Sequence, residues 1–169
     1  MTHLQNIIAI TLIGCGATMG MDLWLVLLKR LGVPVQSFAL IGRWVGHMAS
    51  GTFVHAAIGK SRPIRGELWM GWITHYAVGI TFAFLLVGLV GVEWLHRPTL
   101  MPALTFGAAS AVAPLLIMQP AMGAGIAARR TPTPLRNSLR SIGNHVVFGI
   151  GLYVAAQVAA VILSGVFHE

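Results

Sequence analysis

Four apolar runs, each long enough to cross a lipid bilayer, constrain this sequence more than any other feature. They cover residues 7–28, 69–92, 102–126 and 141–166. A helix of about 20 residues spans the hydrocarbon core of a bilayer, which is roughly 30 Å thick. The chain is 56% hydrophobic and only 9% charged, which is too few charges to cover a water-soluble domain. We therefore predict an all-α membrane protein in which residues 1–169 form a single domain of four antiparallel transmembrane helices.

The basic residues predict how these spans are oriented. Six of the eleven Lys and Arg residues fall in the loop 29–68 and four fall in the loop 127–140. Basic loops are retained on the cytoplasmic side, so we expect both termini in the periplasm of a bacterial inner membrane. The net charge of +7 then reflects the orientation of the spans in the membrane, and no nucleic-acid partner is expected. The expected partners are the lipid bilayer and further copies of the chain in a homo-oligomer.

The first basic loop contains a segment with helical periodicity. Within residues 38–58, apolar side chains recur at helical spacing while Arg43 and His47 lie on another face. This pattern predicts a short interfacial or re-entrant helix. If the helix re-enters the bilayer, Arg43 and His47 approach the spans from the cytoplasmic side. If it lies flat, both residues, and His55 after them, meet lipid phosphates.

Each predicted span carries one polar side chain at a similar depth: Asp22, His75, Gln119 and His145. At about 1.5 Å per residue, each lies roughly 6–10 Å from the cytoplasmic end of its span. An ionisable side chain at mid-bilayer costs about 2.5–3.5 kcal/mol and tends to face the interior of a helix bundle. We predict a polar layer in the cytoplasmic leaflet. It either conducts an ion or a proton, or it is an internal hydrogen-bond network.

The third span carries two further features. Pro114 and Pro120 each remove a backbone hydrogen bond, which predicts a bend in this helix. Met118 and Met122 lie one turn apart on the same span. With His75 and His145 they form a candidate site for a soft metal such as copper(I), to which Cys15 is a further candidate ligand. The two histidines alone are candidate haem ligands, whereas packing is the alternative role of the methionines.

Motifs of known enzymes are missing from the sequence. It contains no phosphate-binding loop, no dinucleotide fingerprint, no nucleophile elbow and no zinc-protease histidine pair, and it has only four acidic residues. We therefore assign no catalytic residue, and an enzyme is the less favoured class.

Four short motifs resemble a family of small bacterial inner-membrane proteins known as a domain of unknown function. They are Gly-Arg-Trp-Val-Gly-His-Met at 42–48, Gly-Trp-Ile-Thr-His-Tyr at 71–76, Met-Gln-Pro-Ala-Met-Gly-Ala-Gly at 118–125 and Asn-His-Val-Val-Phe-Gly at 144–149. The resemblance extends over almost the whole chain and implies a four-helix inner-membrane protein. It implies no substrate and no functional residue.

Three functions fit these observations. The first is a small transporter or a proton- or ion-linked membrane protein, in which Asp22 and the two histidines relay the ion. The second is a non-catalytic assembly or stress factor whose polar layer fixes the helix register. The third is a haem- or copper-binding membrane protein that uses His75 and His145.

Overall fold

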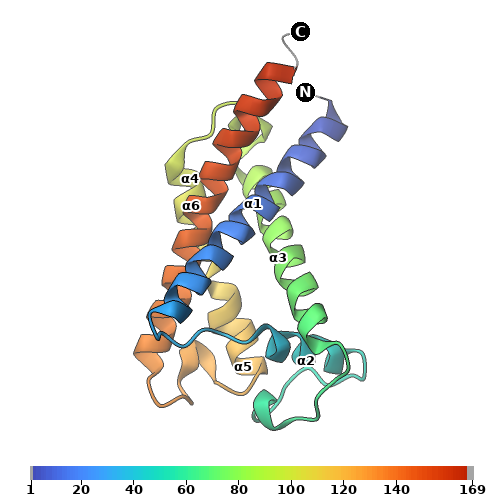
Figure 1. Cartoon of the computed structure of the whole chain (residues 1–169), viewed down its shortest axis with the longest axis vertical. Helices are drawn as coiled ribbons and strands as arrows, with labels where there is room; N and C mark the ends of the chain where they lie inside the picture. The colour runs from blue at the N-terminus through green and yellow to red at the C-terminus, as the bar shows by residue number, and fades with distance from the viewer. Residues whose placement is uncertain (1, 167–169) are drawn as a thin grey trace. The chain divides into compact units, whose positions relative to one another are not determined.

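The computed structural model describes residues 2–166, with side chains as far as residue 162, and all regular elements in this range are helical. Three long helices, α1 (His3–Arg30), α3 (Glu67–Val90) and α6 (Pro134–Val166), provide three of the spans. The remaining span is built from α4 (Leu100–Ser110), the π-helical turn η3 (Ala113–Met118) and α5 (Gln119–Ala121). The loops contain α2 (Phe38–Met48) and the 3₁₀ turns η1 (Ile58–Lys60), η2 (Val92–Leu95) and η4 (Ile126–Ala128). Figure 1 shows their order along the chain.

These elements confirm the predicted fold class. Four helices are long and apolar enough to cross a membrane: His3–Arg30, Glu67–Val90, Leu100–Ala121 and Pro134–Ile162. The predicted loop helix is also present as α2, which ends at Met48, so residues 49–57 continue as a loop. The position of α2 relative to a bilayer stays a prediction.

The third span, predicted at 102–126, ends five residues earlier than expected. It ends at Ala121 because Gly123 and Gly125 adopt φ values of 97° and 74°, in the left-handed region that terminates helices. Around Pro114, which has no backbone N–H to donate, the helix widens into the π-helical turn η3.

The chain divides into two compact units. Unit 1 comprises Met1–Leu27, Tyr76–Ser110 and Asn144–Glu169, and unit 2 comprises Leu28–His75 and Ala111–Gly143. Each unit therefore draws on several helices, and α1, α3 and α6 each contribute to both.

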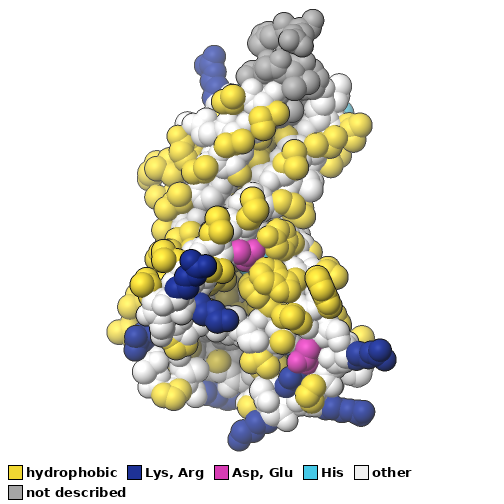
Figure 2. All heavy atoms as spheres, in the orientation of Figure 1, with side chains coloured by type: hydrophobic (Ala, Val, Ile, Leu, Met, Phe, Trp, Pro, Cys, Tyr) yellow, Lys and Arg dark blue, Asp and Glu magenta, His cyan; other side chains and the backbone are white. Residues whose placement is uncertain are grey.

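Unit 1 is a bundle of apolar helices with a core of small and large hydrophobic side chains. Ile13, Leu86 and Leu152, from α1, α3 and α6, are almost fully buried. The helices approach closely at glycines, because a Cβ atom on Gly107 of α4 would collide with the backbone of Gly149 of α6. Large side chains elsewhere on these helices are exposed, such as Leu89 at 76%. Figure 2 shows hydrophobic side chains covering them, as expected of a lipid-facing surface.

Unit 2 contains α2 packed on the first turns of α3. The contact is made by two glycines, since a Cβ on Gly42 would meet the backbone of Glu67 and one on Gly71 would meet that of Phe38. The loop after α2 is held to the end of α5 by backbone hydrogen bonds from His55 N to Ala121 O (2.8 Å) and from Ile58 N to Met122 O (3.0 Å). All ten basic residues of the two basic loops belong to this unit.

Candidate functional site

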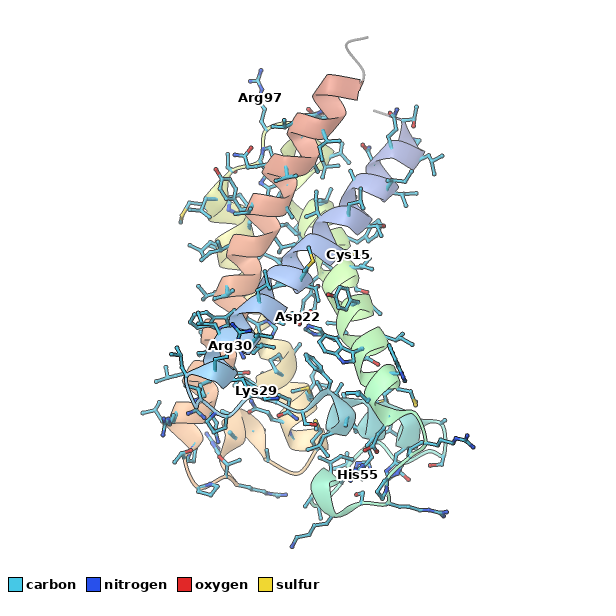
Figure 3. The ribbon with its side chains drawn as sticks, viewed as in Figure 1. Cys15, Asp22, Lys29, Arg30, His55 and Arg97 are labelled. Carbon is cyan, nitrogen blue, oxygen red and sulfur yellow. The ribbon has the colours of Figure 1, made fainter. Side chains whose placement is uncertain are left out.

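In unit 1, the carboxylate of Asp22 accepts a hydrogen bond of 2.9 Å from the hydroxyl of Tyr76. Asp22, which is labelled in Figure 3, lies within the apolar span His3–Arg30. Tyr76 lies on α3. Asp22 was predicted from the sequence as an intramembrane polar group, whereas Tyr76 was not predicted as its partner. The two residues are 54 positions apart, so only the packing of α1 on α3 brings them together.

Two further polar pairs join helices of unit 1. Trp24 on α1 donates its indole N–H to the Asn144 side chain on α6 at 3.1 Å. Ser110 Oγ on α4 lies 2.7 Å from His145 Nδ1 on α6 and also donates to Gly107 O at 2.6 Å. A hydroxyl has one hydrogen, so Ser110 accepts from an Nδ1–H of His145. His145 therefore makes a polar contact between α4 and α6.

In unit 2, Arg43 and Glu67 form a two-pronged ion pair. Arg43 Nε and Nη2 each lie 2.9 Å from a Glu67 carboxylate oxygen, and Arg43 Nη1 donates to Ser61 O at 3.1 Å. Glu67 also accepts from Ile64 N at 3.0 Å. The hydrogen bond to Glu67 raises the pKa of the Arg43 guanidinium above its usual value, so Arg43 stays charged. Arg43 is buried against this loop.

The second predicted loop residue, His47, pairs with His55. His47 Nδ1 lies 2.7 Å from His55 Nε2, and His47 Nε2 lies 3.1 Å from the carbonyl oxygen of Arg62. His55 is 8% exposed, whereas His47 is half-buried. Arg43 and His47 thus share a helix but have different partners. The sequence placed His47 and His55 in the same loop, and the structure brings them to hydrogen-bond distance.

The remaining predicted residues of the polar layer lie in unit 2. The ring of His75 packs against Phe38, with 4.7 Å between ring centroids. Gln119 Oε1 is buried and has no hydrogen-bond partner among the residues that the structure describes. Asp22 and His145 belong to unit 1, so the shared depth of the four residues stays a prediction.

The structure also bears on the predicted metal ligands. Within the described part of the chain, no three His, Cys, Asp or Glu side chains converge in a group that could hold a metal ion. Met122 is buried at 8% exposure, and its carbonyl oxygen binds Ile58 N. Binding of haem or copper through His75, His145, Met118 and Met122 remains a prediction.

The helices and their polar contacts define a small multi-pass membrane protein. A comparison with known families matches residues 11–159 to a family described as a protein of unknown function (DUF2938), and the chain belongs to this family. This confirms the resemblance seen in the sequence. No curated protein and no solved structure matches the chain significantly.

Proposed function

We propose that this protein is a small proton-linked transporter of the bacterial inner membrane and that Asp22 is its proton-binding group. The observation that carries the proposal is the hydrogen bond between Asp22 and Tyr76 within the apolar helices of unit 1. An ionisable side chain in a span is costly, by about 2.5–3.5 kcal/mol at mid-bilayer, and such residues commonly serve as ion or proton sites.

The Tyr76 hydroxyl suits a carboxyl group that changes its protonation state. A phenol can donate a hydrogen bond to a carboxylate and can also accept one from a protonated carboxyl group. The contact between α1 and α3 then persists in both states, and loading a proton does not leave a polar group unpaired. Such a site binds and releases protons while the surrounding helices stay packed.

The proposed topology places both basic loops in the cytoplasm and both termini in the periplasm. It is supported by the ten basic residues of unit 2, compared with Arg97 as the single Lys or Arg of unit 1. Four spans leave little room for a path through one subunit, so the working transporter is a homo-oligomer in this proposal.

The test is proton flux into proteoliposomes that contain the purified protein and a pH gradient. Asp22→Asn keeps the size of the side chain and the hydrogen bond from Tyr76 but cannot bind the proton. We expect this variant to lose flux, whereas Glu93→Gln, at an exposed acid in η2 outside the spans, retains it. Equal flux in wild type and Asp22→Asn would refute the assigned role of Asp22.

The pairs Trp24–Asn144 and Ser110–His145 favour a second function, the non-catalytic membrane factor. Both link α6 to another helix of unit 1, as a network that fixes helix register would. In that case Asn144→Ala and His145→Ala lower thermal stability, and Asp22→Asn changes no ion flux. The same flux assay therefore separates the two functions.

A further inference from the structure

One nitrogen of the histidine pair in unit 2 has no hydrogen-bond partner. His55 Nδ1 is shielded from water and bonds to none of the described residues. More than about 90% of buried polar groups are hydrogen-bonded, and leaving one unpaired is destabilising. A buried imidazole nitrogen without a partner is therefore a candidate binding site.

The neighbouring hydrogen bonds determine which nitrogen atoms carry hydrogen. The carbonyl oxygen of Arg62 can only accept, so His47 Nε2 carries the hydrogen that it donates at 3.1 Å. The neutral His47 ring then has a lone pair on Nδ1. It accepts from His55 Nε2–H at 2.7 Å. In neutral His55 the remaining nitrogen, Nδ1, therefore bears a lone pair.

We propose that His55 Nδ1 is a proton-binding site and that the pair His55–His47 shares the positive charge of the bound proton. Because Nδ1 is buried, a proton is the ligand small enough to bind there. The link between this site and transport rests on the proposed function. The site itself rests on the geometry of the two rings.

The transfer is balanced in atoms and charge. A hydronium ion gives its proton to His55 Nδ1 and leaves as water, and His55 passes its Nε2 hydrogen to His47 Nδ1 across the 2.7 Å contact. His47 then holds hydrogens on both nitrogens and carries the positive charge, while its Nε2–H stays bonded to the Arg62 carbonyl oxygen. On release, the hydrogen on His47 Nδ1 returns to His55 Nε2, His55 Nδ1 gives its proton back to water, and both rings regain their original tautomers.

The charged groups around the pair favour transfer of the positive charge to His47. Glu67 on α3 lies close enough to His47 for an attractive interaction with its charged form. Arg43 on α2 is neutralised by its ion pair with the same carboxylate, and Arg62 contributes its backbone carbonyl from the loop. The charge is therefore most stable on His47, at the solvent side of the pair.

A protonated His55 Nδ1 becomes a donor and needs an acceptor. Unit 2 contains a second buried polar atom without a partner, Gln119 Oε1, which is an acceptor. Gln119 begins α5, whose last residue, Ala121, is bonded through its carbonyl oxygen to the His55 backbone N–H. The two atoms do not bond to each other in this structure, so pairing them when His55 is protonated requires the Gln119 side chain to change its conformation.

The direct test is nitrogen NMR of the histidine rings in the full-length protein, reconstituted in lipid nanodiscs, across a pH titration. At high pH we expect both His47 and His55 as Nε2–H tautomers, and on acidification His55 Nδ1 should gain the first proton. In His47→Gln, the tautomer preference of His55 should be lost. The signal of His96, an exposed histidine of unit 1, should not change in that variant.

An Nδ1–H tautomer of His55 at high pH, or a His55 titration unaffected by His47→Gln, would overturn the proposal. The flux assay then separates it from the proposed function. If the tautomers are as expected but Asp22→Asn transports normally, the proton site stands and the assignment of Asp22 fails. If Asp22→Asn loses flux and His47→Gln does not, the link between the histidine pair and transport fails and the proposed function stands.

Discussion

Arg43 and His55 are both buried basic side chains of unit 2, but they differ in whether all their polar atoms are hydrogen-bonded. Arg43 donates to two carboxylate oxygens and to a loop carbonyl, so its charge is compensated and its position is fixed. His55 is buried as well, but one of its ring nitrogens has no partner in the described structure. A fully paired arginine is typical of a structural ion pair, whereas a buried nitrogen without a partner is typical of a binding site.

Arg43→Gln should destabilise unit 2, because it leaves Glu67 half-buried without its cation and frees the loop around Ser61. We expect a lower thermal unfolding midpoint in detergent, measured by intrinsic fluorescence. Arg62→Gln provides the control, since the Arg62 side chain is exposed and only its backbone carbonyl binds His47. Equal midpoints for the two variants would contradict a structural role for Arg43.

Tyr76→Phe removes the hydroxyl that binds Asp22 and leaves the aromatic ring in place. If this hydrogen bond positions the proton-binding carboxyl group, proton flux should fall but remain measurable, because Asp22 itself can still bind a proton. A variant with the flux of the wild type would remove Tyr76 from the site.

At the scale of helices, hydropathy predicted the spans well because bilayer thickness sets the length of an apolar run. Their ends were harder to predict, since they depend on local backbone geometry. The third span stops at Ala121 owing to the left-handed Gly123, although apolar residues continue to Ile126. The fourth helix begins at Pro134, because proline suits a first helical turn even where the sequence is still polar.

The depth of a residue along its helix could be predicted by counting residues in the sequence. The direction in which its side chain points and its hydrogen-bond partner could not. Counting placed Asp22 in an apolar span, yet its partner Tyr76 depends on how α1 and α3 pack. Glu67 was missed for a similar reason, since its pairing with Arg43 requires the close approach of α2 and α3 at Gly42 and Gly71. Such glycines in two apolar helical segments are the sequence signal that indicates a contact of this kind.

Helix packing in unit 1 can be tested at a glycine. In Gly107→Ala, the added methyl group would meet the backbone of Gly149 on α6, and backbone cannot move aside as a side chain can. We expect a loss of stability of about 1–3 kcal/mol or more, seen as a lower thermal midpoint. Gly88→Ala, on an open face of α3, should be neutral or stabilise by up to about 1 kcal/mol. Equal effects would contradict the close contact of α4 and α6.

For the molecule as a whole, the distribution of charge predicts the orientation in the membrane. Cys15 is the single cysteine, so a Cys15→Ser background permits new cysteines to be labelled one at a time with a membrane-impermeant maleimide. Thr99→Cys, in the connection before α4, should be labelled in intact spheroplasts. Thr52→Cys and Thr133→Cys, in the basic loops, should be labelled only after permeabilisation. The reverse pattern would invert the proposed topology.

The central claim is that a carboxyl group within the apolar helices moves protons. It is tested most directly by comparing proton flux of wild type and Asp22→Asn at equal protein density in vesicles of the same composition. The account predicts flux in the wild type that is lost in Asp22→Asn, with both proteins equally folded. Vesicles that show no flux above the protein-free level, or the same flux for both proteins, would contradict it.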